Sequence, residues 1–238
     1  HLRLAFLHHR ADRRASAIAE VETCLRLART ATNDPALASE MERTLGMFYG
    51  TYENYPKAMD HLLRSISLNS NNAQARFLLG TVYERARRIP DSIRELQRAI
   101  SIDTNFAGAY NYLGYLYADA GIHLDEALRM IRQAIVREPE NAAYLDSMGW
   151  VLFRRGDYPG ALEWLRRAEA RATAAAPERP AGADLSTNQN EDLATILEHL
   201  GDVYAALGRR KEAREAYRRS LKRGDRAGVR LKMEKADR

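Results

Sequence analysis

The sequence predicts an all-α protein built as a solenoid of antiparallel helix pairs. Glycines stand at positions 46, 80, 114, 149 and 201, so they are 34, 34, 35 and 52 residues apart. A period in the low thirties is typical of a repeat unit that stacks on its neighbours. Large apolar residues flank each glycine on one helical face, and small residues follow at fixed offsets. Stacked arrays of this kind usually bind other molecules and rarely catalyse reactions.

The residues around each glycine define the first helix of each repeat. One residue before the glycine and three residues after it, bulky apolar side chains recur on the same helical face. These residues are Leu45 and Tyr49, Leu79 and Tyr83, Leu113 and Tyr117, Met148 and Leu152, and Leu200 and Tyr204. The glycine lies between them, so we expect a close contact with another helix at that point.

The second helix of each repeat is marked by small residues and by a proline. The first small position holds Ala58, Ser92, Ala127, Ala161 and Ala213, and the second holds Ser65, Ala99, Ala134, Ala168 and Ser220. We expect the glycine of the first helix to meet the first small residue, so that the two axes approach to about 8 Å. Pro56, Pro90 and Pro159 recur in register, where a helix begins and proline costs no needed donor.

This pattern resembles the tetratricopeptide repeat, whose consensus has Leu-Gly, then Tyr, Ala, an aromatic residue or Leu, Ala and often Pro. The resemblance covers almost the whole chain and implies a right-handed α-solenoid, with repeats at 39–72, 73–106, 107–141, 142–175 and 194–227. Two repeats depart from the consensus, because Glu42 and Arg76 stand where a bulky residue is usual, four places before the glycine. We expect these two repeats to pack less well on one side.

The rest of the chain completes a single solenoid over residues 1–238. Residues 2–30 are expected to form a degenerate helical pair, and Asn33, Asp34 and Pro35 signal the start of the next helix. Residues 176–193 are interpreted as an inserted loop, because their Pro, Gly and polar content cannot bury enough surface to order itself. A role for this loop as a lid is left open. Residues 228–238 are expected to form a C-terminal capping helix.

Composition limits the classes of function. Cys24 is the only cysteine, which excludes an internal disulfide and a cysteine-based zinc site. His8 and His9 are adjacent and would point to different helix faces, and the sequence has no nucleophile elbow, H-E-x-x-H or phosphate-binding loop. We therefore expect no enzyme activity, no cofactor and no metal. No apolar run approaches the roughly 20 residues that cross a bilayer.

The resemblance also implies a concave groove lined by the first helices, at positions three before, one after and four after each glycine. We call this surface the inner face. In the first two repeats these positions hold Arg43, Met47, Gly50, Phe77, Thr81 and Glu84. In the later repeats they hold Asn111, Tyr115, Ala118, Asp146, Trp150, Phe153, Glu198, Asp202 and Ala205. No repeat has the Lys and Asn pair with which some family members hold a C-terminal carboxylate.

The inner-face residues suggest the chemistry of a partner. Phe77, Tyr115, Trp150 and Phe153 form an aromatic strip, and Asp146, Glu198 and Asp202 place negative charge toward its C-terminal end. The strip suits an extended or helical protein segment with large apolar residues and Arg or Lys. The alternative is that these aromatic residues are covered by packing within the superhelix or by a neighbouring molecule.

Three functions follow from these observations. The first is a non-catalytic adaptor that binds a partner peptide or helix in the groove, and the second is a self-assembling scaffold, a homo-oligomer that stacks through repeat ends. The third is nucleic-acid binding by an arginine-rich convex face, made of Arg94, Arg98, Arg129, Arg132, Arg166, Arg167, Arg218 and Arg219. The formal charge is +5, but negative charge inside the groove argues against nucleic acid there.

The compartment is not encoded in these residues. The last three repeats resemble bacterial tetratricopeptide proteins, some of which are outer-membrane lipoproteins that tether a periplasmic protease or envelope complex. The chain starts without Met or a signal-peptide pattern, which suggests a fragment of a longer protein. Bacterial cytoplasm and periplasm both stay open, as does a fragment of an outer-membrane lipoprotein.

Overall fold

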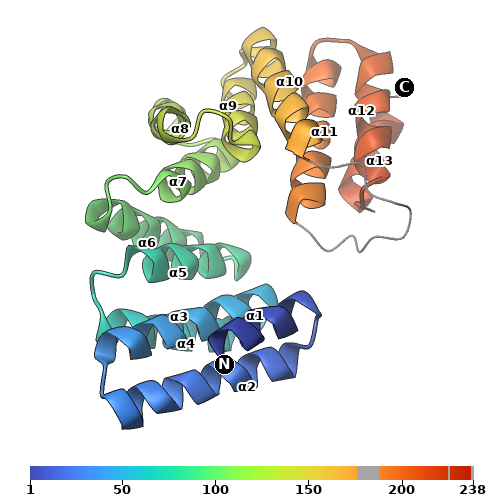
Figure 1. The fold of residues 1–238 in the computed structure, drawn as a ribbon. Helices are drawn as coiled ribbons and strands as arrows, with labels where there is room; N and C mark the ends of the chain where they lie inside the picture. The colour runs from blue at the N-terminus through green and yellow to red at the C-terminus, as the bar shows by residue number, and fades with distance from the viewer. Residues whose placement is uncertain (176–187, 225, 237–238) are drawn as a thin grey trace. The chain divides into compact units, whose positions relative to one another are not determined.

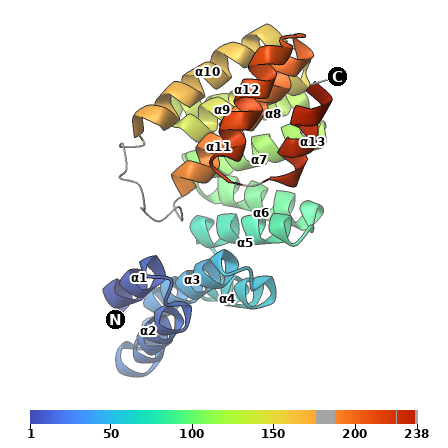
Figure 2. The ribbon, with the colours of Figure 1, turned by 90° about the vertical axis from the view of Figure 1, so that its right-hand side faces the viewer.

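The computed structural model describes residues 1–175, 188–224 and 226–236, and these contain helices and no strands. The chain divides into two compact units, residues 1–109 and residues 110–238. Within each unit, consecutive helices pack as antiparallel pairs (Figures 1 and 2). The predicted fold class, an all-α solenoid of helix pairs, is therefore confirmed.

The first unit begins with the helical pair expected at residues 2–30. Its helices are α1 (Leu2–Arg10), α2 (Arg14–Leu27), the π-helix η1 (Ala28–Thr32), α3 (Pro35–Thr51), α4 (Tyr55–Leu68), α5 (Ala73–Arg85) and α6 (Ile89–Ile102). Asp34 caps α3, because its carboxylate accepts hydrogen bonds from the backbone N–H groups of Ala36 and Leu37. One continuous apolar core runs from α1 to α5.

The second unit contains most of α7 (Ala107–Ala120), followed by further pairs. Its helices are α8 (Leu124–Arg137), α9 (Ala142–Arg154), α10 (Tyr158–Ala175), α11 (Asn188–Ala206), α12 (Arg210–Leu221) and α13 (Ala227–Ala236). A core cluster joins α9, α10, α11 and α12. Val229 of α13 is buried against Ala213 and Tyr217 of α12, so α13 packs on the last helix pair.

The inserted loop expected at residues 176–193 does not extend over residues 188–193. Residues 188–193 form the start of α11, and Leu193 is buried in the core of the second unit. The prediction of a loop over these residues is wrong, because the polar run hid the apolar positions that α11 needs. Residues 176–187 lie outside the described part of the chain.

Each repeat glycine meets a large side chain, and this corrects the expected contact. A Cβ atom added to Gly46 would lie 2.5 Å from Cγ of Leu62, and one added to Gly149 would lie 2.5 Å from Cγ of Leu165. The small residue, Ala58 or Ala161, contributes its backbone carbonyl oxygen at 3.2 Å. The glycine therefore makes room for the residue four places after the small one, because i and i+4 share a helix face.

The turn between the two helices of a repeat also recurs in a fixed conformation. Glu53, Arg87, Gly121, Gly156 and Gly208 all have positive φ, from 60° to 84°. Their positions follow the same intervals as the repeat glycines. A left-handed residue ends the first helix and turns the chain into the second. In the first two repeats this position is held by Glu53 and Arg87, for which the left-handed conformation costs free energy.

In the two repeats that depart from the consensus, the polar residue at the unusual position pairs with a residue of opposite charge type. Glu42 of α3 is fully buried and accepts hydrogen bonds from His61 of α4 at 2.7 Å and from Arg29 at 2.5 Å. Arg76 of α5 donates to Glu95 of α6 at 2.9 Å. The expectation of poorer packing overlooked this pairing, since each polar residue has a partner on the second helix of its own repeat.

Candidate partner-binding surfaces

The predicted inner-face residues are divided between the two units. Arg43, Met47, Phe77 and Thr81 lie on α3 and α5 of the first unit. Asn111, Tyr115, Asp146, Trp150, Phe153, Glu198 and Asp202 lie on α7, α9 and α11 of the second. All of them are therefore on the first helices of their repeats.

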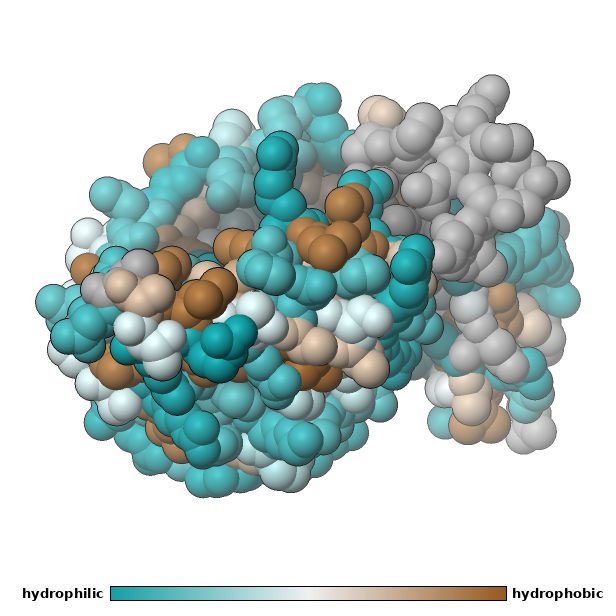
Figure 3. All heavy atoms as spheres, turned by 60° about the horizontal axis from the view of Figure 1, so that its bottom comes forward, coloured by the Kyte–Doolittle hydropathy of each residue, from teal (hydrophilic) through white to brown (hydrophobic). Residues whose placement is uncertain are grey.

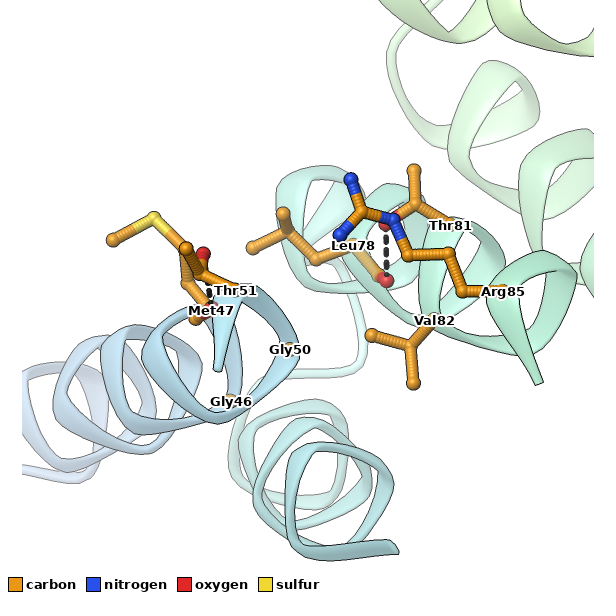
Figure 4. Close-up of a pocket in the computed structure, with 8 residues that line it drawn as sticks. All are labelled: Gly46, Met47, Gly50, Thr51, Leu78, Thr81, Val82 and Arg85. Carbon is orange, nitrogen blue, oxygen red and sulfur yellow. Dashed lines mark hydrogen bonds between the residues drawn. The ribbon is translucent and has the colours of Figure 1, made fainter. Parts of the chain in front are cut away.

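A pocket opens between α3 and α5 in the first unit, with a cavity volume of about 130 Å³. It is lined by Gly46, Met47, Gly50, Thr51, Leu78, Thr81, Val82 and Arg85 (Figure 4). Met47, Gly50 and Thr81 are inner-face positions, so the structure brings these predicted residues together. Leu78 and Arg85 were missed, because they stand two before and five after Gly80, outside the three offsets used.

The pocket wall is mostly apolar, and its two threonine hydroxyls donate hydrogen bonds within their own helices. Figure 4 shows Met47 and Thr51 on α3 across from Leu78, Thr81, Val82 and Arg85 on α5. The Thr51 hydroxyl donates to the carbonyl oxygen of Met47 at 3.0 Å, and the Thr81 hydroxyl donates to that of Leu78 at 2.8 Å. Neither hydroxyl needs a ligand.

Arg85 is the charged group of this pocket. Its side chain is exposed, and it forms no ion pair or hydrogen bond with any residue that the structure describes. By contrast, both Nε and Nη2 of Arg43 donate to Glu40, at 3.0 and 2.7 Å. Phe77 packs its ring against Phe106, with centroids 5.0 Å apart. Arg43 and Phe77 do not line the pocket.

In the second unit the predicted residues of α9 gather around a buried histidine. Trp150 stacks on Phe153, with ring centroids 5.1 Å apart, and on His199 of α11, with centroids 4.2 Å apart. Nδ1 of His199 lies 3.0 Å from both carboxylate oxygens of Asp146. Asp146 and His199 are both buried, so Asp146 is engaged inside the chain. His199 was not predicted from the sequence, because it stands two residues before Gly201, outside the three offsets used.

The charge of His199 is set by its surroundings. Burial lowers the pKa of His199, but Asp146 raises it through its charge and hydrogen bonds, and Asp202 and Glu198 add to this effect. The net result is a pKa above its ordinary value, so the imidazolium form is favoured. The ring that faces Trp150 is then a cation stacked on an indole.

Two polar atoms on the inner face of the second unit are buried without a hydrogen bond to any described residue. They are Nε1 of Trp150 and Oδ1 of Asn111. Trp150 as a whole is half-buried, and so is Phe153. Tyr115, the remaining predicted aromatic residue of α7, is engaged within the chain.

The acidic residues of α11 already have cationic partners in α13 and directly before it. Nζ of Lys232 lies 2.8 Å from Glu198 and 2.7 Å from Asp202, and Arg226 lies 3.2 Å from Glu198. The hydroxyl of Tyr217 donates to Asp202 at 2.9 Å. Burial raises the pKa of Glu198, but Lys232 and Arg226 together hold it below its ordinary value. The sequence did not reveal that α13 neutralises these carboxylates.

Two further kinds of feature were sought among the described residues, a metal centre and a membrane-spanning helix. No group of three or more His, Cys, Asp and Glu side chains could hold a metal ion in the described ranges. Among the described helices, none combines the length and apolarity needed to cross a bilayer. Figure 3 shows one face of the molecule on which apolar residues are scattered among hydrophilic ones. Such scattered apolar residues are normal for a folded surface.

Comparison with protein families gives a match to the tetratricopeptide repeat over residues 52–109 and 113–180, and to a second tetratricopeptide model over residues 193–226. The matched residues make up more than half of the sequence. This chain belongs to the tetratricopeptide repeat family. Proteins of this family are generally interaction modules without catalytic activity. The match agrees with the periodicity of Gly80, Gly114, Gly149 and Gly201, which lie in the matched ranges.

Solved tetratricopeptide structures share the fold. The type IV pilus biogenesis factor PilW has a TM-score of 0.70 at 16% identity, over 92% of this chain and 89% of its own. A tetratricopeptide protein of Thermus thermophilus has a TM-score of 0.65 at 18% identity, over 84% and 98%. YrrB, described as having an unusual peptide-binding site, has a TM-score of 0.52 at 25% identity, over 71% and 84%. Comparison with curated proteins gave no significant match.

Proposed function

We propose that this tetratricopeptide protein is a non-catalytic adaptor that binds a peptide or helix of a partner protein on its inner face. The observation that carries the proposal is the pocket between α3 and α5, which includes Met47, Gly50 and Thr81 at inner-face positions. Small apolar cavities next to a few polar groups are the usual form of a side-chain binding site. The likeness to YrrB, a tetratricopeptide protein with an unusual peptide-binding site, supports the same function.

The aromatic cluster of α9 supplies a second surface for the partner. Trp150 and Phe153 are half-buried and stacked on each other, so they offer a rigid aromatic surface at low entropic cost. Large apolar partner residues fit such a surface, and Trp is frequent among residues that dominate binding energy. We expect the partner segment to carry apolar residues that reach Trp150.

Basic residues of a partner would have to compete with Lys232 for Glu198 and Asp202, which could not be seen from the sequence. A partner Lys or Arg at Glu198 and Asp202 has to displace Lys232, which holds both carboxylates. Exchange of one cation for another gains little Coulomb energy. Basic partner residues therefore bind at this place only when α13 moves away or when they reach the outer side of the carboxylates.

A pulldown with the full-length protein, followed by calorimetry with a captured partner, tests this function. Trp150→Ala is expected to weaken binding about ten-fold or more. Trp164→Ala is the matched control, because Trp164 is also half-buried in the second unit but lies on the second helix of its repeat, α10. Equal loss of affinity in both variants, or no loss in Trp150→Ala, contradicts the assignment of the inner face.

The two alternative functions are separated by simple measurements. Nucleic-acid binding would use the eight arginines named for the convex face, but most of these arginines already have a partner in the chain. These pairs are Arg94 with Asp91, Arg98 with Glu95, Arg166 with Tyr204, Arg167 with Trp164, Arg218 with Glu215 and Arg219 with Glu169. Nucleic-acid affinity that falls steeply with salt favours this alternative. For self-assembly, a molar mass that rises with concentration in light scattering favours a stacked scaffold.

A further inference from the structure

We propose that the pocket between α3 and α5 binds an aliphatic side chain of the partner and that Arg85 binds an Asp or Glu side chain next to it. This inference rests on the proposed function and narrows it to an acidic and apolar segment. It differs from the sequence prediction of a basic partner, which depended on carboxylates of the second unit. Three features of the pocket support it, namely its size, its lining and the unpaired charge of Arg85 at its edge.

The size of the pocket suits one aliphatic side chain. Its cavity volume is about 130 Å³, and an apolar protein cavity of about 150 Å³ holds benzene. A Leu or Met side chain is of similar size. The residue at position 50 is glycine, and an added Cβ there would lie 3.2 Å from Cγ2 of Val82. Gly50 thus keeps α3 and the apolar wall of α5 close together without filling the space beside Met47 and Leu78.

The lining of the pocket favours an apolar occupant. Met47, Leu78 and Val82 present carbon and sulfur atoms, and Leu78 and Met47 are only half-buried. The hydroxyls of Thr51 and Thr81 already donate to backbone carbonyl oxygens. An acceptor group inside the pocket would lose water and find no hydroxyl donor there.

The charge beside the pocket is positive. Arg85 lines the pocket and is exposed, and it has no ion pair with any described residue. In Figure 4 its guanidinium group folds back over α5 beside Leu78 and Thr81. The acidic neighbour Glu84 is engaged with another group of the chain, and Glu40 is held by Arg43. Arg85 is therefore the group that a carboxylate of the partner can pair with, at a distance that one or two residues of extended peptide span.

Selection from a phage-displayed library of random nonapeptides tests the inference with the full chain. The displayed peptides are joined to the coat protein at their C-terminus, so acidic side chains and not terminal carboxylates are sampled. We expect enriched peptides to combine Leu or Met with Asp or Glu one or two residues away. Enrichment of Lys or Arg beside the apolar residue overturns the inference.

Variants of the pocket then test the site with one enriched peptide. Arg85→Ala is expected to weaken binding about five-fold. Arg26→Ala is the control and is expected to have no effect, because the Arg26 side chain is also exposed in the first unit and has no partner among the described residues. Thr51→Phe is expected to weaken binding about ten-fold, because the ring occupies the pocket. Arg85→Glu should prefer a peptide in which Lys replaces the acidic residue. All three sites are exposed, and circular dichroism checks that the variants fold.

The outcomes separate this inference from the proposed function. Enriched peptides whose affinity is unchanged by Arg85→Ala and Thr51→Phe but reduced by Trp150→Ala overturn the inference and leave the adaptor function intact. No enriched peptide at all overturns both. Loss of affinity in both pocket variants, with reversal of charge preference in Arg85→Glu, supports the inference.

Discussion

His61 hydrogen-bonds through Nδ1 to the fully buried carboxylate of Glu42 at 2.7 Å, across the two helices of one repeat. One period later, Arg76 and Glu95 occupy the same two positions with the acidic and basic partners exchanged. Tetratricopeptide repeats usually place an apolar residue at the first position. The two N-terminal repeats therefore replace an apolar contact by an ion pair and its hydrogen bonds, which holds each helix pair in one register.

Removal of one member of the buried pair should be costly. Glu42→Leu leaves His61 without its carboxylate, and we expect the free energy of unfolding to fall by about 3 kcal/mol. The double variant Glu42→Leu with His61→Leu is expected to recover most of this loss, because apolar residues fit the same position in other repeats. Arg29, the other partner of Glu42, is half exposed and can be solvated. Urea unfolding measures both variants, and additive losses in the double variant would contradict a coupled pair.

The turn residues offer a way to stabilise the protein. Arg87 has φ of 61°, where later repeats have Gly121, Gly156 and Gly208. Arg87→Gly removes the cost of a left-handed arginine, about 1 to 2 kcal/mol, and adds a smaller entropic cost. We expect a net gain of about 0.5 to 1 kcal/mol.

Gly156→Ala is the reverse experiment. No atom lies within 4 Å of an added Cβ at this position, so the expected loss of about 1 kcal/mol reflects backbone conformation alone. Thermal unfolding of the two variants measures both effects. Stability changes of the same sign in Arg87→Gly and Gly156→Ala would refute the role of the turn conformation.

Close packing at the repeat glycines predicts a large effect of a single methyl group. Gly149→Ala places a Cβ 2.5 Å from Cγ of Leu165 and should reduce the free energy of unfolding by about 2 kcal/mol. Gly228→Ala in α13 meets no atom within 4 Å and is the control. Denaturant midpoints that fall equally in the two variants would show that helix contact at Gly149 is not the cause.

The His199 and Asp146 pair predicts a dependence of stability on pH. The folded state raises the pKa of His199 above the ordinary 6.5, so its contribution is fully present below about pH 6.5 and is lost as the pH rises through the folded value. When the pH is raised from about 6 to about 9, the urea midpoint of the wild type should therefore fall by more than the midpoint of His199→Gln. An equal or larger fall in His199→Gln would contradict the pairing.

The sequence predicted the periodic part of the fold well. The capping signal at Asp34 and the helix starts at Pro56 and Pro90 follow from local chemistry, and the period of the repeats located the helix pairs. The partners of Glu42 and Asp146 could not be predicted, because they depend on contacts between positions far apart in the sequence. The neutralisation of Glu198 and Asp202 by Lys232 is of the same kind, since it needs the docked position of α13.

The candidate site was predicted in part for a similar reason. Three offsets from each glycine identified Met47, Gly50 and Thr81, which line the pocket, and Trp150 and Phe153, which stack. The offsets missed Leu78 and Arg85, because a pocket between two helices also uses flanking positions whose side chains lean toward it. Which inner-face carboxylates are free could be decided only after the ion pairs were known.

Mapping of a bound peptide by NMR tests the central claim most directly. The full chain, labelled with ¹⁵N, is titrated with an enriched nonapeptide, and amide shift changes are assigned along the chain. We expect the largest changes on the first helices, in α3 and α5 around Met47 and Arg85 or in α9 around Trp150. Changes confined to the second helices α4, α6 and α10, or no changes at saturating peptide, would contradict binding on the inner face.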